Sequence, residues 1–248
     1  NVENEITDET QEKLSKYEKQ YQSLEMRYAS LKEKYTDIED YSSWQEDTIP
    51  ANKITLVNNG THAGPKTPLV LQTIRYLAQN AENVTIQTPY VICNGYMYDT
   101  LNEIASHAQL KIILNAVEKG SNPWGCTDYL NQKKKILETG ADVYELMNDY
   151  PVHTKAVLIN DRLSVVGSYN LDMRSTYLDT ELMLVIDSEK LSQQIHETES
   201  DYMEKSKEVL ANGQETEGAK YQGKVLNRKK KLYYDVLRII IRPLRQLL

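Results

Sequence analysis

The chain has 248 residues, 26% of them charged, and a formal net charge of −7. That length allows one hydrophobic core with appended segments, and the acidic balance argues against a general nucleic-acid-binding protein. Cys93 and Cys126 lack the spacing of a zinc or redox motif and fit a reduced interior, while no apolar run reaches the roughly 18 residues of a membrane-spanning helix.

Residues 8–40 are predicted to form one long helix. Their apolar side chains recur at alternating spacings of three and four, which is a heptad seam, made of Leu14, Tyr17, Tyr21, Leu24, Tyr28, Leu31, Tyr35 and Ile38. A dimerising coiled coil could use this seam, but tyrosine at half of its positions favours a connecting helix laid against a preceding domain. Residues 41–52 indicate a linker, and we assign residues 1–45 to this first segment.

From Lys53 onwards, short apolar runs alternate with helical patterns. Strands are predicted at 54–59, 84–88, 110–116 and 141–146, and helices at 67–80, 96–107 and 127–138. This alternation predicts an α/β fold, a mixed β-sheet with helices packed on both faces. Ligands bind at strand ends in such folds, so Tyr90, which follows the second strand, is predicted to line the pocket; a core aromatic is the alternative.

The stretch from His153 to Glu181 has the side chains of an active site. A strand here would put His153 and Lys155 on one face, and a proton carrier or nucleophile beside a fixed cation suits phosphate. Ser168 and Asn170 follow the next apolar run, and both can donate hydrogen bonds to an oxyanion. Glu181 opens another apolar run, where a buried carboxylate needs a partner, and we expect the His153 imidazole to be that partner.

The end of the chain differs in composition from the rest. Residues 188–210 are predicted as a polar helix and residues 211–223 as a flexible connector, so we place the catalytic half-domain at 46–212 and the connector with its tail at 213–248. Against a single acidic residue, Asp235, residues 224–248 carry Lys224, Arg228, Lys229, Lys230, Lys231, Arg238, Arg242 and Arg245. A helix from Lys231 would be amphipathic and basic, which is typical of a membrane-interface helix; docking on another domain is the alternative.

The order His-x-Lys, then Gly-Ser-x-Asn-x-Asp-x-Arg-Ser, resembles the phospholipase D superfamily in the version found in cardiolipin synthases, over about residues 53–190. The resemblance implies a phospholipase D-like fold in which the His forms a phosphohistidine or acts as its general acid. It also implies that the Lys and Asn hold the phosphate and that a downstream acid braces the His. These roles fall on His153, Lys155, Asn170 and Glu181 as catalytic residues, with Ser168 beside the substrate.

Two features depart from that motif. Asn160 stands where the motif has Asp, but by strand parity position 160 faces away from His153 and Lys155, so an acid there would brace the scaffold. The superfamily's site also needs two such motifs, from two halves of one chain or from two subunits, and this chain carries one. Because it begins at Asn1 rather than Met, we interpret it as the C-terminal half of a two-motif enzyme; a homodimer is the alternative.

These observations predict a phosphatidyltransferase of the cardiolipin synthase type, peripheral on the cytoplasmic face of the cell membrane, with room for a further anchor upstream. Its partners would be a phospholipid substrate, an anionic membrane surface bound through residues 224–248, and the missing half or a second subunit. We expect no cofactor, no metal and no nucleic acid. A phospholipase D-type phosphodiesterase or nuclease and a catalytically silent membrane scaffold are the alternatives, although a nuclease would need a basic rim around the site.

Overall fold

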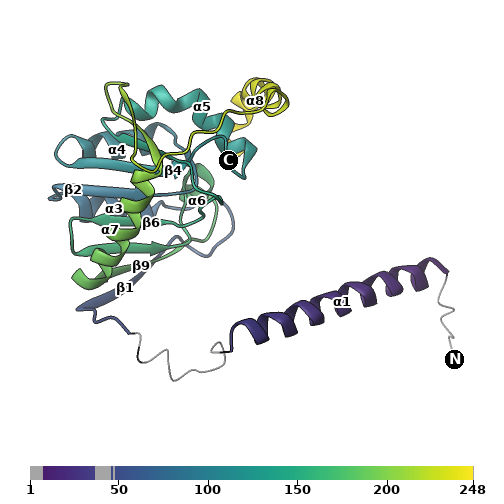
Figure 1. The fold of residues 1–248 in the computed structure, drawn as a ribbon. Coiled ribbons are helices and arrows are strands. Elements are labelled where there is room, and N and C mark those ends of the chain that lie inside the picture. Colours follow the sequence, from purple (N-terminus) through teal and green to yellow (C-terminus); the bar gives the residue numbers. More distant parts are fainter. Residues whose placement is uncertain (1–7, 37–45, 47, 248) are drawn as a thin grey trace. The chain divides into compact units, whose positions relative to one another are not determined.

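The computed structural model describes residues 8–36, 46 and 48–247. It divides the chain into two compact units, Asn1–Ile49 and Pro50–Leu248 (Figure 1). The first unit contains helix α1 (Asp8–Lys34), whose seam residues from Leu14 to Leu31 are exposed. The helix ends at Lys34, before the predicted end at residue 40. Residues 37–40 and most of the predicted linker lie outside the described residues, so the boundary at residue 45 stays a prediction.

The second unit is built on a nine-stranded mixed sheet with the order β1-β9-β7-β6-β2-β4-β5-β10-β11. The strands are β1 (Lys53–Asn58), β2 (Asn83–Gln87), β4 (Gln109–Asn115), β5 (Asp142–Leu146), β6 (Ala156–Ile159), β7 (Leu163–Gly167), β9 (Leu182–Asp187), β10 (Ser206–Val209) and β11 (Glu215–Glu217). The central strands β2, β4 and β5 are parallel, and every other neighbouring pair is antiparallel. A separate parallel pair joins β3 (Val91–Ile92) to β8 (Leu171–Asp172).

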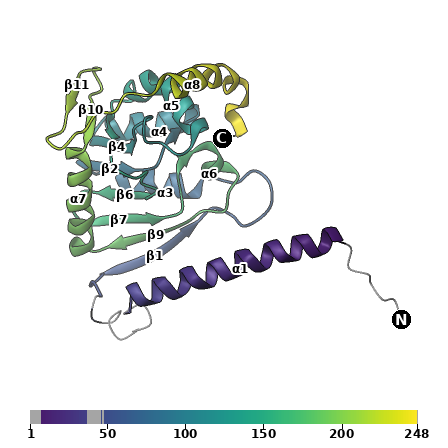
Figure 2. The same cartoon turned by 45° about the vertical axis from the view of Figure 1, so that its right-hand side comes forward.

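Helices cover both faces of the sheet, as Figure 2 shows. On one face, α3 (Leu69–Ala78), α4 (Gly95–Ala105) and α5 (Pro123–Leu137) contribute to the main core together with Val165 of β7. On the other face lies α7 (Glu189–Glu204), where Ser192 Oγ is 3.0 Å from Ser164 Oγ. Neighbouring residues of a strand point to opposite faces, so Val165 faces the main core and Ser164 faces α7. The sheet therefore has helices on both faces, and the predicted fold class is confirmed.

Several predicted element bounds are wrong. The polar helix expected to reach Leu210 ends at Glu204, because the next residues pair with β5 as β10 and continue into β11. The turn between these strands contains Gly213 at φ 83°, a left-handed conformation that favours glycine, so part of the predicted flexible connector is a hairpin.

Helix α5 begins at Pro123 rather than Thr127, since Asn122 caps it. Strand β6 begins at Ala156, so His153 and Lys155 precede the strand instead of lying on it.

The C-terminal tail forms helix α8 (Arg228–Ile240) and a 3₁₀ helix, η1 (Arg242–Leu247). Helix α8 starts before Lys231, the predicted first residue, because the Asn227 side chain accepts a hydrogen bond from Lys230 N at 2.7 Å. It packs on α5 within the second unit, and the boundary at 212/213 stays a prediction of the sequence. None of the described helices is long and apolar enough to cross a membrane.

Candidate active site

The residues singled out between 153 and 181 gather at one end of the sheet. His153 and Lys155 come just before β6, Ser168 and Asn170 just after β7, and Glu181 just before β9. Because β7 is antiparallel to both β6 and β9, the end of β7 lies beside the starts of its two neighbours. The strand order therefore brings together side chains that three separate loops supply.

His153 and Lys155 are in direct contact. The Lys155 Nζ lies 2.5 Å from His153 Nδ1 and 2.6 Å from the His153 carbonyl oxygen, to which it donates. Lys155 is buried and His153 is exposed, so the imidazole can be reached from solvent while its neighbouring cation is held in place. The pKa of His153 lies below its ordinary value, first through partial desolvation of the ring and second through the charge of Lys155. The pair thus places an imidazole of lowered pKa beside a lysine ammonium group.

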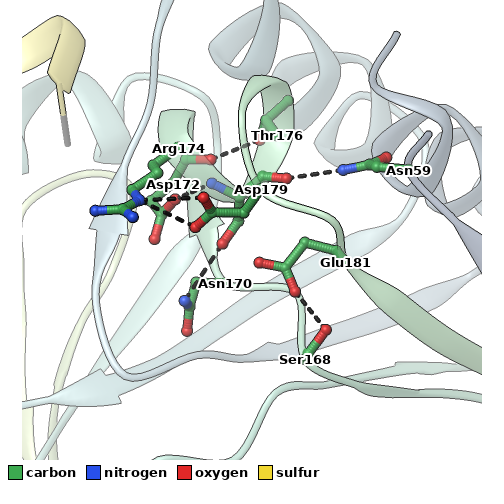
Figure 3. A network of polar contacts seen from close by, with 9 residues as sticks. Asn59, Ser168, Asn170, Asp172, Arg174, Thr176, Asp179 and Glu181 are labelled. Carbon is green, nitrogen blue, oxygen red and sulfur yellow. Dashed lines mark hydrogen bonds and ion pairs between the residues drawn. The ribbon is translucent and has the colours of Figure 1, made fainter. Parts of the chain in front are cut away.

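Glu181 is a buried carboxylate whose hydrogen-bond partner is Ser168. Its Oε2 accepts the Ser168 hydroxyl, and the Ser168 Oγ in turn accepts the backbone N–H of Leu182 at 3.0 Å. Figure 3 shows the two side chains pointing toward one another. The expectation that Glu181 would meet the His153 imidazole is therefore wrong for this structure. The carboxylate acts on Lys155 instead, where its charge opposes the lowering of the lysine pKa that burial causes.

Asn170 lies beside the first turn of α6 (Met173–Tyr177). Its Nδ2 donates to Ser175 Oγ at 3.3 Å, while its Oδ1 is buried without a hydrogen-bond partner among the described residues. A half-turn of the amide would let Oδ1 accept the Ser175 hydroxyl and free the NH₂ group to donate to an oxyanion. Asp172 fixes this turn, because its Oδ1 accepts Ser175 N at 2.6 Å, and burial raises the pKa of Asp172 to about 6.

Asn59, which the sequence analysis did not single out, links the segment that carries Asn170 to the segment that carries Glu181. It follows β1 directly and is fully buried. Its side chain donates to the Ser175 carbonyl at 2.8 Å and accepts Val70 N at 3.2 Å, and its own N–H donates to the Glu181 carbonyl at 3.1 Å. Asn59 thus holds the segment that carries Asn170 in place relative to the segment that carries Glu181 (Figure 3). The one signal in the sequence is an asparagine before Gly60 at the end of an apolar run.

Tyr90, the residue predicted to line the pocket, lies half-buried in the loop between β2 and β3. The side chain of Thr88 donates to its carbonyl at 3.0 Å and closes a tight turn. Its ring approaches Gly125 so closely that a Cβ at that position would lie 2.9 Å from it. The pKa of Tyr90 is raised by burial and then by the charge of Asp172, which places the phenol in the electric field of the site.

Comparison with known proteins identifies the family to which the chain belongs. Residues 73–201 match the family model described as the cardiolipin synthase, PLD-like domain. Cardiolipin synthase A of Proteus mirabilis is 29% identical over 174 residues, which are 67% of this chain and 34% of that protein. Cardiolipin synthase A of Klebsiella pneumoniae is 30% identical over 142 residues, 55% of this chain and 27% of that protein. The chain thus spans about a third of the length of the curated relatives it matches.

Solved structures show the same fold at low sequence identity. The phospholipase D family member Nuc from Salmonella typhimurium superposes with a TM-score of 0.50 at 13% identity, covering 67% of this chain and all of Nuc. Phosphatidylserine synthase from Haemophilus influenzae superposes with a TM-score of 0.54 at 16% identity, covering 79% of this chain and 47% of that enzyme. On the family match over residues 73–201 and the shared fold, the chain belongs to the phospholipase D superfamily, in the family of cardiolipin synthase PLD-like domains.

Proposed function

We propose that this chain supplies one half of the active site of a phosphatidyltransferase of the cardiolipin synthase type, which moves a phosphatidyl group between phospholipids through a phosphohistidine intermediate. The observation that carries the proposal is the contact between His153 and Lys155, 2.5 Å apart, at the sheet end that also holds Asn170, Ser168 and Glu181. An accessible imidazole beside a buried cation and an amide that can donate hydrogen bonds suits an anionic phosphodiester.

The proposed reaction has two steps. A histidine from a second unit attacks the phosphorus, forming a P–N bond as the P–O bond to the leaving alcohol breaks, and His153 gives its proton to that alcohol. An acceptor alcohol then gives its proton to His153 and attacks the phosphorus, which breaks the P–N bond and completes the transfer. His153 ends each cycle in the protonation state in which it began.

The neighbouring residues hold charge in this scheme. Lys155 and Asn170 would stabilise the negative charge that develops on the phosphoryl oxygens. Glu181 would keep Lys155 charged despite its burial, since the carboxylate opposes the lowering of the lysine pKa, and would hold the Ser168 hydroxyl in one orientation. These roles require no movement of the backbone, because each side chain is already fixed by a described contact.

A second phospholipase D-like unit is the partner that completes the site in this proposal. The chain carries one His-x-Lys motif and spans 34% of the length of the Proteus mirabilis relative. Next to Glu181, strands β1 and β9 present an exposed apolar face, with Leu56 paired to Leu184 and Asn58 to Leu182. We propose that this face, defined by Ile54, Leu56, Leu182 and Leu184, packs against the second unit, which is either the preceding half of the polypeptide or another copy.

The test is to supply phosphatidylglycerol to membranes that contain the full-length parent protein and to follow lipid products by mass spectrometry. Cardiolipin should form and should be lost in His153→Ala, while the matched variant His196→Ala, altered on the exposed side of α7, should retain it. Phosphatidic acid in place of cardiolipin would make the protein a hydrolase. If His153→Ala made as much product as the native protein, the proposed role of this site would be wrong.

A further inference from the structure

One face of helix α8 is docked on the domain. Tyr234, Leu237 and Ile241 are buried where α8 packs on α5. Beside them, Arg238 Nε donates to Asn131 Oδ1 at 2.9 Å, and Asn131 Nδ2 donates to the Arg238 carbonyl at 2.9 Å. The helix is therefore held in one rotational position by apolar and polar contacts together.

The 3₁₀ helix that follows α8 is fixed by an ion pair between a partly exposed arginine and a buried carboxylate. Arg245 Nε donates to Asp128 Oδ1 at 2.5 Å, and its Nη2 donates to Asp128 Oδ2 at 3.1 Å and to the Cys93 carbonyl at 2.8 Å. Asp128, which the sequence analysis did not assign a role, is fully buried in α5. Cys93 follows β3, whose partner β8 ends at Asp172 beside the candidate site. The end of the tail is thus tied to the elements that carry that site.

The opposite face of α8 is apolar and exposed. The side chains that form it, hereafter the outer stripe, are between 48% and 70% exposed and comprise Leu232, Tyr233, Val236, Ile239 and Ile240. Their spacings place them on one side of a helix with 3.6 residues per turn, across from the docked residues. A single helix therefore uses two apolar faces, one for the domain and one that points to solvent.

Basic side chains border the outer stripe. Arg228, Lys229, Lys231 and Arg242 are exposed, and none of these four side chains has a hydrogen bond or ion pair with another described residue. Asp235 is the one acidic residue of this helix. Lysine is depleted from the cores of protein–protein interfaces, whereas apolar side chains flanked by Lys and Arg match the boundary between the headgroups and acyl chains of an anionic bilayer.

We propose that the outer stripe and its flanking cations dock on an anionic bilayer surface and that the docked face of α8 holds the domain against that surface in one orientation. This inference names a partner for the proposed phospholipid-transferring site and rests on that function. The 3₁₀ helix η1 contacts α6, and Figure 2 shows both at the same end of the sheet. The bilayer would consequently meet the domain on the side where Asn170 and Asp172 lie.

The experiment is co-sedimentation of the chain with vesicles of phosphatidylglycerol and with vesicles of phosphatidylcholine. The native chain should bind the anionic vesicles and bind the neutral ones much more weakly. In Val236→Glu/Ile239→Glu, the partition coefficient for phosphatidylglycerol vesicles should fall by about tenfold or more, since two apolar contacts are replaced by charges that the anionic surface repels.

The matched control is Gln72→Glu/Tyr76→Glu, which alters two exposed residues of α3. This variant should bind vesicles like the native chain, and circular dichroism should show that both variants remain folded. Absence of native binding, or equal binding by Val236→Glu/Ile239→Glu, would overturn the proposal. If the native chain self-associated without binding vesicles, and Val236→Glu/Ile239→Glu abolished that self-association, the outer stripe would be assigned to contact with a second copy. Since vesicle binding needs no turnover, each of these failures would leave the catalytic proposal standing.

Discussion

The contact between His153 and Lys155 couples the proton of the imidazole to the charge of its neighbour. Partial desolvation and the lysine charge both keep the pKa of His153 below its ordinary value. Lys155→Met removes the charge and keeps an apolar side chain of similar length, so we expect the pKa of His153 to rise. Titration of the histidine ring protons by NMR measures this change, and His196, exposed on α7, serves as the internal reference. An unchanged His153 pKa would show that desolvation alone sets it.

Asn160 explains why the motif can depart from Asp at this position. It has φ 50°, in the left-handed region that Asn tolerates, and its Oδ1 accepts Glu82 N at 3.0 Å and Asn83 N at 3.1 Å. It lies at the end of β6, away from His153. An acceptor oxygen is what the position needs, and either Asn or Asp supplies one.

Asn160→Asp should therefore change the free energy of unfolding by less than about 0.5 kcal/mol, whereas Asn160→Ala should lower it by about 2 kcal/mol, through lost hydrogen bonds and left-handed strain. Urea denaturation measures both values. Asn160→Gly separates the two causes, because glycine accepts the backbone conformation but offers no acceptor. A loss in Asn160→Asp as large as in Asn160→Ala would contradict the acceptor role.

Helix α7 buries a carboxyl group that lacks a partner. Glu199 is fully buried, neither of its carboxyl oxygens has a hydrogen-bond partner among the described residues, and the nearby charge is that of Lys111 on β4. Burial raises the pKa of Glu199 to about 8. Below the unfolded pKa the carboxyl is protonated in both states. As the pH rises toward 8, the unfolded state loses its proton while the folded state keeps it, so the free energy of unfolding falls.

Glu199→Gln should remove this pH dependence. We expect the variant to match the native chain near pH 4.5 and to exceed its free energy of unfolding by a few kcal/mol, on the order of one per pKa unit, at pH 8 and above. Denaturation at several pH values measures the difference. Glu197→Gln, on the exposed side of the same helix, should show no such trend. Parallel pH profiles of Glu199→Gln and the native chain would refute the assignment.

Local patterns predicted the elements that are set by local chemistry and missed those that depend on distant pairing. The strands at β2, β4, β7 and β9 and the spacing from His153 to Glu181 were readable because apolar alternation and motif spacing are local. The β10–β11 hairpin was missed because its residues are polar and acquire strand geometry by pairing with β5. Asn59 was missed for a related reason, since its partners Ser175 and Glu181 are more than a hundred positions away. The catalytic roles themselves stay predictions.

If the exposed apolar face of β1 and β9 is an interface, charges placed on it should lower activity. Leu56 and Leu184 are opposite each other and are 60% and 41% exposed. If this face packs against a second phospholipase D-like unit, Leu56→Glu/Leu184→Glu should lower turnover by the full-length parent about tenfold or more, because two charges would be buried in the interface. Mass spectrometry of lipid products measures turnover.

A matched surface variant controls for the added charge. Tyr76→Glu alters an α3 residue that is 70% exposed and should leave turnover unchanged. The thermal midpoint of the isolated chain should differ little between native, Leu56→Glu/Leu184→Glu and Tyr76→Glu, since these side chains are exposed there. Full turnover by Leu56→Glu/Leu184→Glu would place the partner unit on another surface.

The pairing of β1 with β9 also sets the order in which the domain can be completed during synthesis. Asn52 and Asp187, bonded across this pair, are 135 residues apart in sequence. At about 5–20 residues per second, a ribosome needs roughly 10 s to cover such a distance, and for that time β1 has no strand beside it. Until β9 emerges, the backbone hydrogen-bonding groups of β1 have no partner strand. The hydrogen bonds of Asn59 to Ser175 and Glu181 can therefore form only after residue 181 has been translated.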